Sequence, residues 1–414
     1  MESAFALLDK TKIIILLVRF ISLFISLGYI KIYTHYLSLP QLGIFFYLST
    51  ISYFLNAVVF VPADLFQQTH ISADRSVPIP FAYALGLNAR AILIAVVFVG
   101  GVFLYSLFDK NLTGYEVVLA FFLSIFLFFC TSLRALLNNR SHGVFVVFML
   151  MVEASLKVVL FFAIVYNGNA SADALILSNI AALAVEFAII GYFLYSYEKF
   201  DFAEKRTVSK RDFAAFCYPV SISAVCNWLQ LQGYRLVYVW FGHAEIAGLY
   251  ATISNIGSVG MSATGQIYSQ LFLPRIYQTR GLFIKNFLVL AMAISVVVLL
   301  AYAILGPFIL GLLTKGDFKP FYKLMLFGVL VEASNLMIGA ITAFSGLIGR
   351  TSILITSNLI GVVLSVATMG FALIVDPTNP YLTGASLGIS QAVTLLFLAG
   401  FVRRAFANGG MSNA

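Results

Sequence analysis

Eight ionisable side chains lie inside long apolar stretches of this sequence, and their types indicate the chemistry that the chain could perform. Four are basic and four are acidic: Arg19, Arg90, Lys157, Arg235, Asp64, Glu153, Glu186 and Glu332. Because an ionised group is costly in an apolar environment, such residues are candidates for function. A fixed cation can bind an anionic group, and arginine binds phosphate oxygens through two parallel hydrogen bonds. A buried carboxyl can instead take up a proton or pair with a cation.

The four basic residues are the candidate binding groups for an anion, and each also has a structural interpretation. Arg19, Arg90 and Arg235 lie near enough to the ends of their apolar stretches for a long side chain to reach water. Lys157 follows Glu153 by four residues, so these two side chains are expected to pair on one helix face. Both interpretations stay open on the sequence alone.

The four acidic residues are the candidates for coupling to an ion gradient. Glu186 lies in AALAVEFAII and Glu332 in GVLVEASNLMIG, each with no basic residue within one helical turn. An isolated carboxyl of this kind is expected to bind protons. A salt bridge between the two halves of the chain is the competing interpretation. Asp64 and Glu153 complete the group.

Uncharged polar side chains recur at helical spacing in four of the apolar stretches. A polar stripe on an apolar helix faces protein or water rather than lipid. Small and polar residues also pack between neighbouring helices, which is the structural alternative. Because the stripes occur at equivalent places in both halves of the chain, we expect them to line a shared cavity. The candidate lining residues are Ser22, Ser26, Asn56, Asn227, Gln230 and Gln266.

The composition shows which elements must position these residues. Hydrophobic residues make up 61% of the chain and charged residues only 10%, against about 25% charged residues in a soluble domain. A helix of about 20 apolar residues crosses a bilayer, and continuous apolar runs exclude membrane strands. We therefore predict an all-α integral membrane protein with twelve spans, near 11–34, 42–66, 80–108, 115–137, 143–166, 172–197, 211–240, 245–273, 282–313, 320–347, 351–375 and 381–407.

The basic residues between the spans predict the topology. An even number of spans places both termini on one side, where the loops and tails hold sixteen basic residues, Arg134 and Arg140 among them, against five on the other side. This asymmetry predicts cytoplasmic termini. The net charge of +8 therefore indicates topology and not a nucleic-acid partner. The three cysteines and four histidines lack metal-ligand spacing, so we expect no metal and no cofactor.

A repeat relates the two halves of the chain. The segment Tyr29 to Ile51 matches Tyr234 to Ile256 without gaps at five of 23 positions, among them Gly43 with Gly248. Both copies begin on the same predicted side of the membrane, which is typical of parallel repeats that place a substrate site between two halves. We predict an N-lobe over 1–200 with six spans, a cytoplasmic linker over 201–212 and a C-lobe over 213–414 with six more.

The number of spans, the two six-helix halves and the motif YLSLPQLGIFFYLST after the first outer turn resemble Wzx-type O-antigen flippases. These belong to the multidrug/oligosaccharidyl-lipid/polysaccharide (MOP) superfamily. The resemblance implies a V-shaped pair of lobes in the bacterial inner membrane. It also implies a substrate, an oligosaccharide repeat unit on undecaprenyl pyrophosphate, that passes from the cytoplasmic to the periplasmic leaflet by alternating access through a cationic cavity. The implied partners are the lipid-linked oligosaccharide, the bilayer and other membrane proteins of polysaccharide assembly.

Two other classes of protein compete with this interpretation. A multidrug or cation antiporter of the same superfamily would need a more acidic cavity, and four acidic against four basic residues do not decide this. A polymerase or lipid-dependent glycosyltransferase would need a substantial extracytoplasmic loop with a pair of carboxylates for acid–base chemistry. The predicted outer loops are short and hold no such pair, so we expect a transporter and not an enzyme.

Overall fold

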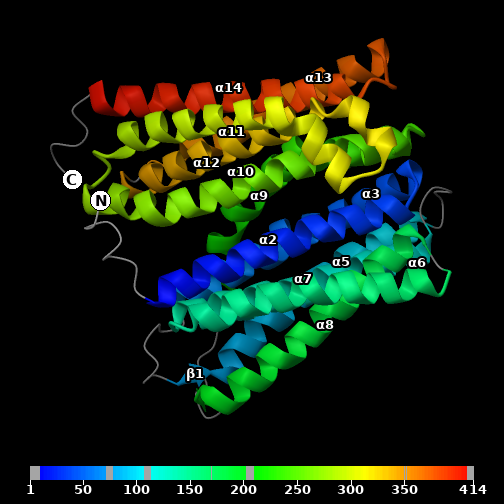
Figure 1. Ribbon diagram of the computed structural model, residues 1–414. Helices are drawn as coiled ribbons and strands as arrows, with labels where there is room; N and C mark the ends of the chain where they lie inside the picture. Colours follow the sequence, from blue (N-terminus) through cyan, green and yellow to red (C-terminus); the bar gives the residue numbers. More distant parts are fainter. Residues whose placement is uncertain are drawn as a thin grey trace. The chain divides into compact units, whose positions relative to one another are not determined.

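The computed structural model describes residues 10–70, 78–106, 113–168, 170–201, 209–348, 350 and 352–407, and within them the chain is almost entirely helical (Figure 1). This confirms the all-α class. The α-helices are α2 (Lys10–Tyr36), α3 (Leu39–Leu55), α4 (Val61–His70), α5 (Phe81–Ser106), α6 (Gly114–Asn139), α7 (Gly143–Tyr166), α8 (Ala172–Tyr197), α9 (Lys210–Trp240), α10 (Ala244–Gln278), α11 (Ile284–Leu313), α12 (Leu324–Leu347), α13 (Ser352–Val375) and α14 (Pro380–Ala407).

Each predicted span coincides with a helix. Span two is built from α3, the π-helical turn η1 (Asn56–Phe60) and α4 in direct succession. Among the described residues, nine helices are long and apolar enough to cross a membrane, and α5 adds a shorter apolar stretch, Gly86–Gly101. The long helices α9 and α10 are not among the nine, which fits the polar stripes that the sequence places on them. These features support a multi-pass membrane protein.

The chain groups into two compact units. Unit 1 comprises Met1–Leu37 and Tyr47–Val225, and unit 2 comprises Ser38–Phe46 and Cys226–Ala414. Helices α3 and α9 are therefore each divided between the units. The lobes and linker predicted above stay a prediction, and residues 202–208 of that linker lie outside the described residues.

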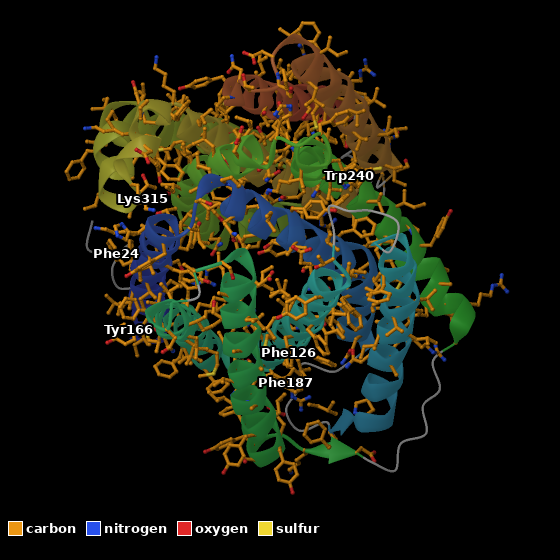
Figure 2. The ribbon with its side chains drawn as sticks, turned by 90° about the vertical axis from the view of Figure 1, so that its right-hand side faces the viewer. Phe24, Phe126, Tyr166, Phe187, Trp240 and Lys315 are labelled. Atoms are coloured by element: carbon orange, nitrogen blue, oxygen red, sulfur yellow. The ribbon has the colours of Figure 1, made fainter. Side chains whose placement is uncertain are left out.

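Unit 1 is built around α7 and α8. Helix α2 packs along α7, and α8 packs against both α6 and α7 (Figure 1). Aromatic rings add contacts within the unit: Phe60 of η1 stacks on Phe128 of α6 with ring centroids 4.4 Å apart, and Phe126 of α6 meets Phe187 of α8 (Figure 2). At the far end of α8, strand β2 (Phe200–Asp201) pairs in parallel with β1 (Ile79–Pro80).

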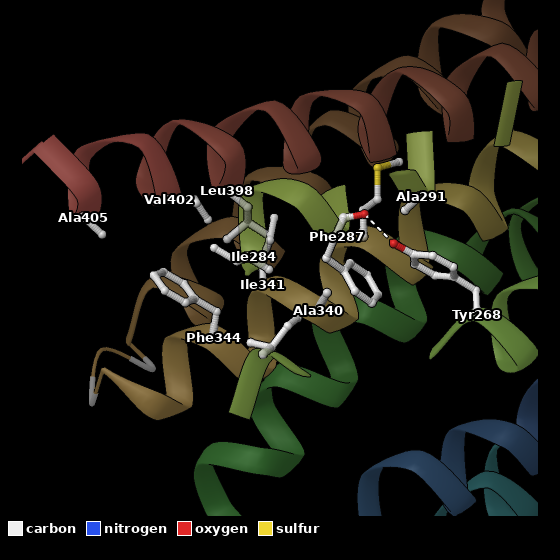
Figure 3. Packing of buried hydrophobic residues seen from close by; sticks show 12 residues of the cluster. Tyr268, Ile284, Phe287, Ala291, Ala340, Ile341, Phe344, Leu398, Val402 and Ala405 are labelled. Carbon is white, nitrogen blue, oxygen red and sulfur yellow. Dashed lines mark hydrogen bonds between the residues drawn. The ribbon is translucent and has the colours of Figure 1, made fainter. Parts of the chain in front are cut away.

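Unit 2 is a bundle in which α12 is central, because α10, α11 and α14 all pack against it. A hydrophobic cluster joins these four helices, and the hydroxyl of Tyr268 donates a hydrogen bond to the carbonyl of Phe287 within it, at 2.8 Å (Figure 3). Helices α10 and α12 approach closely at two glycines. A Cβ on Gly257 would lie 2.9 Å from the carbonyl carbon of Met325, so only glycine fits there.

Several large aromatic side chains are exposed on the surface of the helices, as is common in membrane proteins. Phe24, Tyr166 and Trp240 project from the ribbon (Figure 2) and are exposed. Tyr192 and Tyr195 near the end of α8 are also exposed. Tyrosine and tryptophan are enriched where a protein meets the membrane–water interface, so the exposed surface is suited to lipid rather than to water.

Candidate functional site

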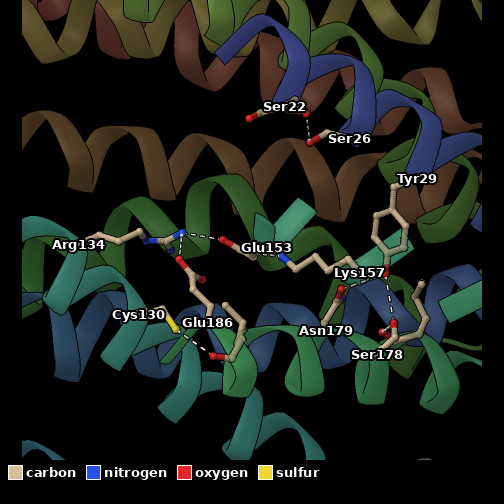
Figure 4. Close-up of polar contacts among 12 residues, drawn as sticks. Ser22, Ser26, Tyr29, Cys130, Arg134, Glu153, Lys157, Ser178, Asn179 and Glu186 are labelled. Atoms are coloured by element: carbon tan, nitrogen blue, oxygen red, sulfur yellow. Dashed lines mark hydrogen bonds and ion pairs between the residues drawn. The ribbon is translucent and has the colours of Figure 1, made fainter. Parts of the chain in front are cut away.

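Four charged side chains from three helices meet inside unit 1 (Figure 4). The Nη1 of Arg134 on α6 lies 2.6 Å from Oε2 of Glu153 on α7 and 3.3 Å from Oε1 of Glu186 on α8. Lys157, one turn after Glu153, forms an ion pair with its other carboxylate oxygen. We call these four residues the charge cluster.

The charge cluster confirms one expectation and corrects two. The pair that the four-residue spacing predicts between Glu153 and Lys157 is present. The isolation of Glu186 is wrong, because Arg134 reaches it from another helix. The placement of Arg134 among the basic residues of loops is also wrong, because α6 continues past it and its side chain is buried. A pair of residues 52 positions apart leaves no local signal in a sequence.

The charge cluster holds three helices together, and breaking it would leave charges buried without a partner. Two basic and two acidic groups cancel when all are ionised, and the side chain of Glu186 has no exposed surface. Removing one partner from a buried ion pair costs about 3–5 kcal/mol, because the remaining charge stays buried. The cluster is therefore a structural element of unit 1 as well as a candidate site.

Tyr29 of α2 reaches α8 next to the charge cluster (Figure 4). Its hydroxyl donates to Oδ1 of Asn179 at 2.9 Å and lies 3.4 Å from the hydroxyl of Ser178. Its ring meets those of Tyr33 and Phe161 edge to face. Tyr29, in the C-terminal half of α2, therefore binds α2 to its neighbours.

Ser22 and Ser26, two predicted lining residues in the middle of α2, are half-buried. Ser22 donates to the carbonyl of Val18 at 2.8 Å, and Ser26 donates to the carbonyl of Ser22 at 2.9 Å. Both hydroxyls are thus satisfied within their own helix. Arg19 lies on the same stripe and is half-buried. Arg90, on α5, is half-buried as well.

Arg235, the fourth predicted cation, is in unit 2. It is 6% exposed, and its Nε donates to the hydroxyl of Tyr234 at 2.9 Å. The guanidinium carbon lies 4.9 Å from the ring centroid of Phe46, a cation–π contact that is stronger when water is excluded. The alternative in which this side chain extends outward to water is wrong.

Some of the predicted lining residues are exposed, whereas others pack against a neighbouring helix. Asn227 on α9 and Gln266 on α10 are exposed. Gln230 is only 1% exposed and donates its amide to the hydroxyls of Ser390 and Thr394, each at 3.3 Å. Its assignment to a cavity lining is therefore corrected: it packs α9 against α14, as polar residues do between membrane helices.

Three other predicted residues lie in distinct places. Asn56 is buried at the first position of η1. Asp64 on α4 accepts a hydrogen bond from Ser132 at 2.5 Å. Glu332 on α12 is half-buried and accepts from the amide of Asn335 at 3.2 Å. The described residues therefore do not gather the predicted acidic side chains into one site.

Comparison with known proteins identifies the fold. No model of a known protein family matches the chain, and no curated protein matches it. The solved structures that match include the lipid II flippase MurJ in an inward closed conformation, at 13% identity, with a TM-score of 0.67, over 95% of this chain and 87% of that one. An outward-facing multidrug-resistance MATE transporter of the MOP superfamily matches at 13% identity and a TM-score of 0.58, over 99% of this chain and 98% of that one.

A third solved structure is a MOP superfamily transporter from Pyrococcus furiosus, described as having a binding pocket of reverse polarity. It matches at 12% identity and a TM-score of 0.59, over 95% of this chain and 96% of that one. The chain therefore has the fold of MOP-superfamily transporters along nearly its whole length. All three of these proteins are described as transporters or flippases.

Proposed function

We propose that this protein is a flippase that moves undecaprenyl-pyrophosphate-linked oligosaccharide repeat units from the cytoplasmic to the periplasmic leaflet of the bacterial inner membrane. The polar face of α2 contributes to the path of the head group. Alternating access exposes this path to one side of the membrane at a time, while the prenyl tail stays in lipid.

The observation that carries the proposal is the distribution of charge in unit 1. Glu153 and Glu186 are neutralised by Arg134 and Lys157. Helix α2 holds no acidic residue, so the half-buried Arg19 gives its polar stripe a positive charge. A path with that charge favours an anionic pyrophosphate head group, and arginine suits its oxygens. The fold of a lipid II flippase, matched over 95% of the chain, supports a lipid-linked substrate.

A multidrug or cation antiporter is the second candidate, because MATE transporters share the fold over as much of the chain. Such a transporter needs carboxylates that can meet a cationic drug. Two of the four acidic candidates are occupied by ion pairs, and Asp64 accepts from Ser132. This arrangement favours the flippase.

Reconstituted protein tests the proposal. Proteoliposomes carry a fluorescent undecaprenyl-pyrophosphate-linked oligosaccharide, and a membrane-impermeant quencher reports its movement between leaflets. We expect transfer by the wild type and slower transfer by Arg19→Gln. The matched control is Arg403→Gln, which removes an exposed arginine near the end of α14 and should transfer at the wild-type rate. Transport of a cationic dye without transfer of the oligosaccharide would instead support the antiporter.

A further inference from the structure

The connection between α10 and α11 presents three exposed basic side chains at one end of unit 2. Arg275 is in the last turn of α10, Arg280 is in the connection itself, and Lys285 is in the first turn of α11. Tyr277 and Leu282 lie between them in the sequence and are 50% and 62% exposed. We call these five residues the turn surface. Exposed apolar side chains next to cations are typical of a protein surface that meets lipid head groups.

The turn surface lies at an end of unit 2 where the sequence of that unit places no acidic residue. From residue 226 onward the chain holds four acidic residues. Glu245 is in the first turn of α10, Asp317 is in the 3₁₀ turn η2 (Gly316–Phe321), and Asp376 directly follows α13, so these three belong to the opposite ends of the helices. Glu332 lies in the interior of α12. The three cations of the turn surface therefore give this end of unit 2 a positive charge.

Aromatic rings hold two of these cations in place. The guanidinium carbon of Arg275 lies 5.3 Å from the ring centroid of Phe272 and 5.9 Å from that of Phe283. The Nζ of Lys285 lies 4.0 Å from the ring centroid of Phe406 on α14. All three rings pack against the hydrophobic cluster of Figure 3, which gives the cations a fixed support. A cation–π contact uses the face of a guanidinium, so the N–H groups in its plane can still donate two parallel hydrogen bonds to a phosphate.

The third cation, Arg280, occupies an unusual backbone position. Its φ is 49°, in the left-handed region that residues other than glycine rarely adopt. Hydrogen bonds fix the turn around it: the amide of Gly281 donates to the carbonyl of Ile276 at 2.7 Å, and the amide of Phe283 donates to the hydroxyl of Thr279 at 3.1 Å. Glycine would adopt this conformation at a lower cost. The backbone therefore gives no reason for an arginine here, whereas the charge of the side chain does.

We propose that the turn surface binds the head group of an anionic phospholipid of the surrounding bilayer. Arg275 and Arg280 donate to the phosphate oxygens, and Lys285 adds a third positive charge. Leu282 and Tyr277 contact the lipid below its head group, at the membrane interface. A soluble anion would leave these two apolar side chains in water, whereas a phospholipid meets both the cations and the apolar groups. All five residues belong to unit 2, so this lipid site is separate from the path proposed along α2.

Quenching by brominated lipids measures binding at the turn surface itself. A full-length reporter carries Leu282→Trp together with Trp228→Phe and Trp240→Phe, which remove the two native tryptophans. It is reconstituted into phosphatidylcholine vesicles that contain a minor fraction of brominated phosphatidylglycerol or, in parallel, the same fraction of brominated phosphatidylcholine. We expect stronger quenching by the brominated phosphatidylglycerol. Equal quenching by the two lipids would overturn the proposal.

Substitutions of the cations in this reporter test their role. Arg280→Gly should lower the preference for phosphatidylglycerol about fivefold, the factor usual for one basic residue near an anionic surface. It should also keep or raise the unfolding temperature, because glycine suits the left-handed position; a lost preference would then not reflect unfolding. Adding Arg275→Gln and Lys285→Gln should abolish the preference. A triple variant with the preference of the parent reporter would overturn the proposal.

The matched control removes the same charge from the opposite end of unit 2. Lys315→Gln, Lys319→Gln and Lys323→Gln change three lysines in and around η2, at the end where Asp317 and Asp376 also lie. This control should keep the preference for phosphatidylglycerol. A loss as large as that of the triple variant would overturn the proposal, because the preference would then follow the net charge of the protein and not the turn surface.

Discussion

Gly43 and Gly248 lie against each other where α3 and α10 meet within unit 2. A Cβ on Gly43 would lie 2.6 Å from the carbonyl carbon of Ala244, and a Cβ on Gly248 would lie 2.7 Å from the amide nitrogen of Gly43. These two glycines are the paired positions of the sequence repeat. Ala244 precedes Gly248 by four residues, and Leu39, which Gly248 contacts, precedes Gly43 by four. Each copy of the repeat thus contributes the same surface to one helix crossing.

A methyl group at this crossing should destabilise unit 2. Gly43→Ala and Gly248→Ala each place a Cβ inside the backbone of the facing helix, where no side chain can move aside. Overpacking of this kind costs about 1–3 kcal/mol, which thermal unfolding in detergent would detect. Gly233→Ala on α9 is the control, because nothing lies within 4 Å of its Cβ. It should be neutral or slightly stabilising, since alanine favours a helix over glycine by about 1 kcal/mol.

Removal of Arg134 should be among the most damaging changes in unit 1. Arg134→Met leaves Glu153 with Lys157 but takes the only cation in direct contact with Glu186 among the described residues. We expect a loss of about 3–5 kcal/mol, measured as a fall in the unfolding temperature. Adding Glu186→Gln should recover part of the loss, because the orphaned charge is then absent. Equal stability of the single and double variants would show that the two side chains do not interact.

The hydroxyl of Tyr29 should contribute measurably to the attachment of α2. Tyr29→Phe keeps the ring contacts to Tyr33 and Phe161 and removes the hydrogen bond to Asn179. The expected cost is about 0.5–1.5 kcal/mol, the usual net value of one such bond. Tyr36→Phe is the control on the same helix, since Tyr36 is exposed and packs on Phe162 through its ring. If both variants unfold at the same temperature, the bond to Asn179 contributes nothing.

A second ionic contact should hold the ends of α6 and α8 together. Glu198 lies 2.7 Å from Nε of Arg140, which is fully buried, and 2.8 Å from Nε2 of His142. Directly after it, the amide of Ile79 donates to the carbonyl of Lys199 at 2.8 Å, the bond that starts the β1–β2 pairing. Glu198→Gln should leave the charge of Arg140 buried and uncompensated, which costs several kcal/mol.

Amide hydrogen exchange measures the loss of Glu198 at the adjacent β1–β2 strand pair. We expect the amide of Ile79 to exchange faster in Glu198→Gln, while amides in the middle of α7 keep their protection. Glu245→Gln, which changes an exposed glutamate in the first turn of α10, serves as the control. Unchanged exchange at Ile79 would mean that the strand pair does not depend on the ionic contact.

The sequence predicted what depends on local spacing and missed what depends on packing. Continuous apolar runs predict a helix at each expected span, and nine of the described helices are long and apolar enough to cross a bilayer. The Glu153–Lys157 pair was predictable because four residues return to the same helix face. The contact of Glu186 with Arg134 was not predictable, because it joins α6 and α8. The sequence of either helix alone does not show which of its faces packs against the other.

Polar stripes were ambiguous for the same reason. Asn227 and Gln230 are three residues apart on α9, yet one is exposed and the other bonds to Ser390 and Thr394. Whether a polar side chain meets water or a neighbouring helix depends on α14, which lies far away in sequence. Gly43 and Gly248 carried a stronger signal, because only glycine permits the close approach and the repeat places one in each half.

The π-helical turn η1 gives span two one residue more than a regular α-helix would need. Ser52 before it donates to the carbonyl of Ala120, and Asp64 after it accepts from Ser132, so both flanks are docked on α6. Within the turn, the carbonyl of Val58 accepts from Ser221 at 2.7 Å. Each residue of an α-helix turns the chain by about 100°, so deleting one from α4 would swing Asp64 off its partner. Deleting one residue from η1 would instead restore a regular α-helix. This turn is therefore the place where the span can lose a residue while Ser52 and Asp64 both keep facing α6.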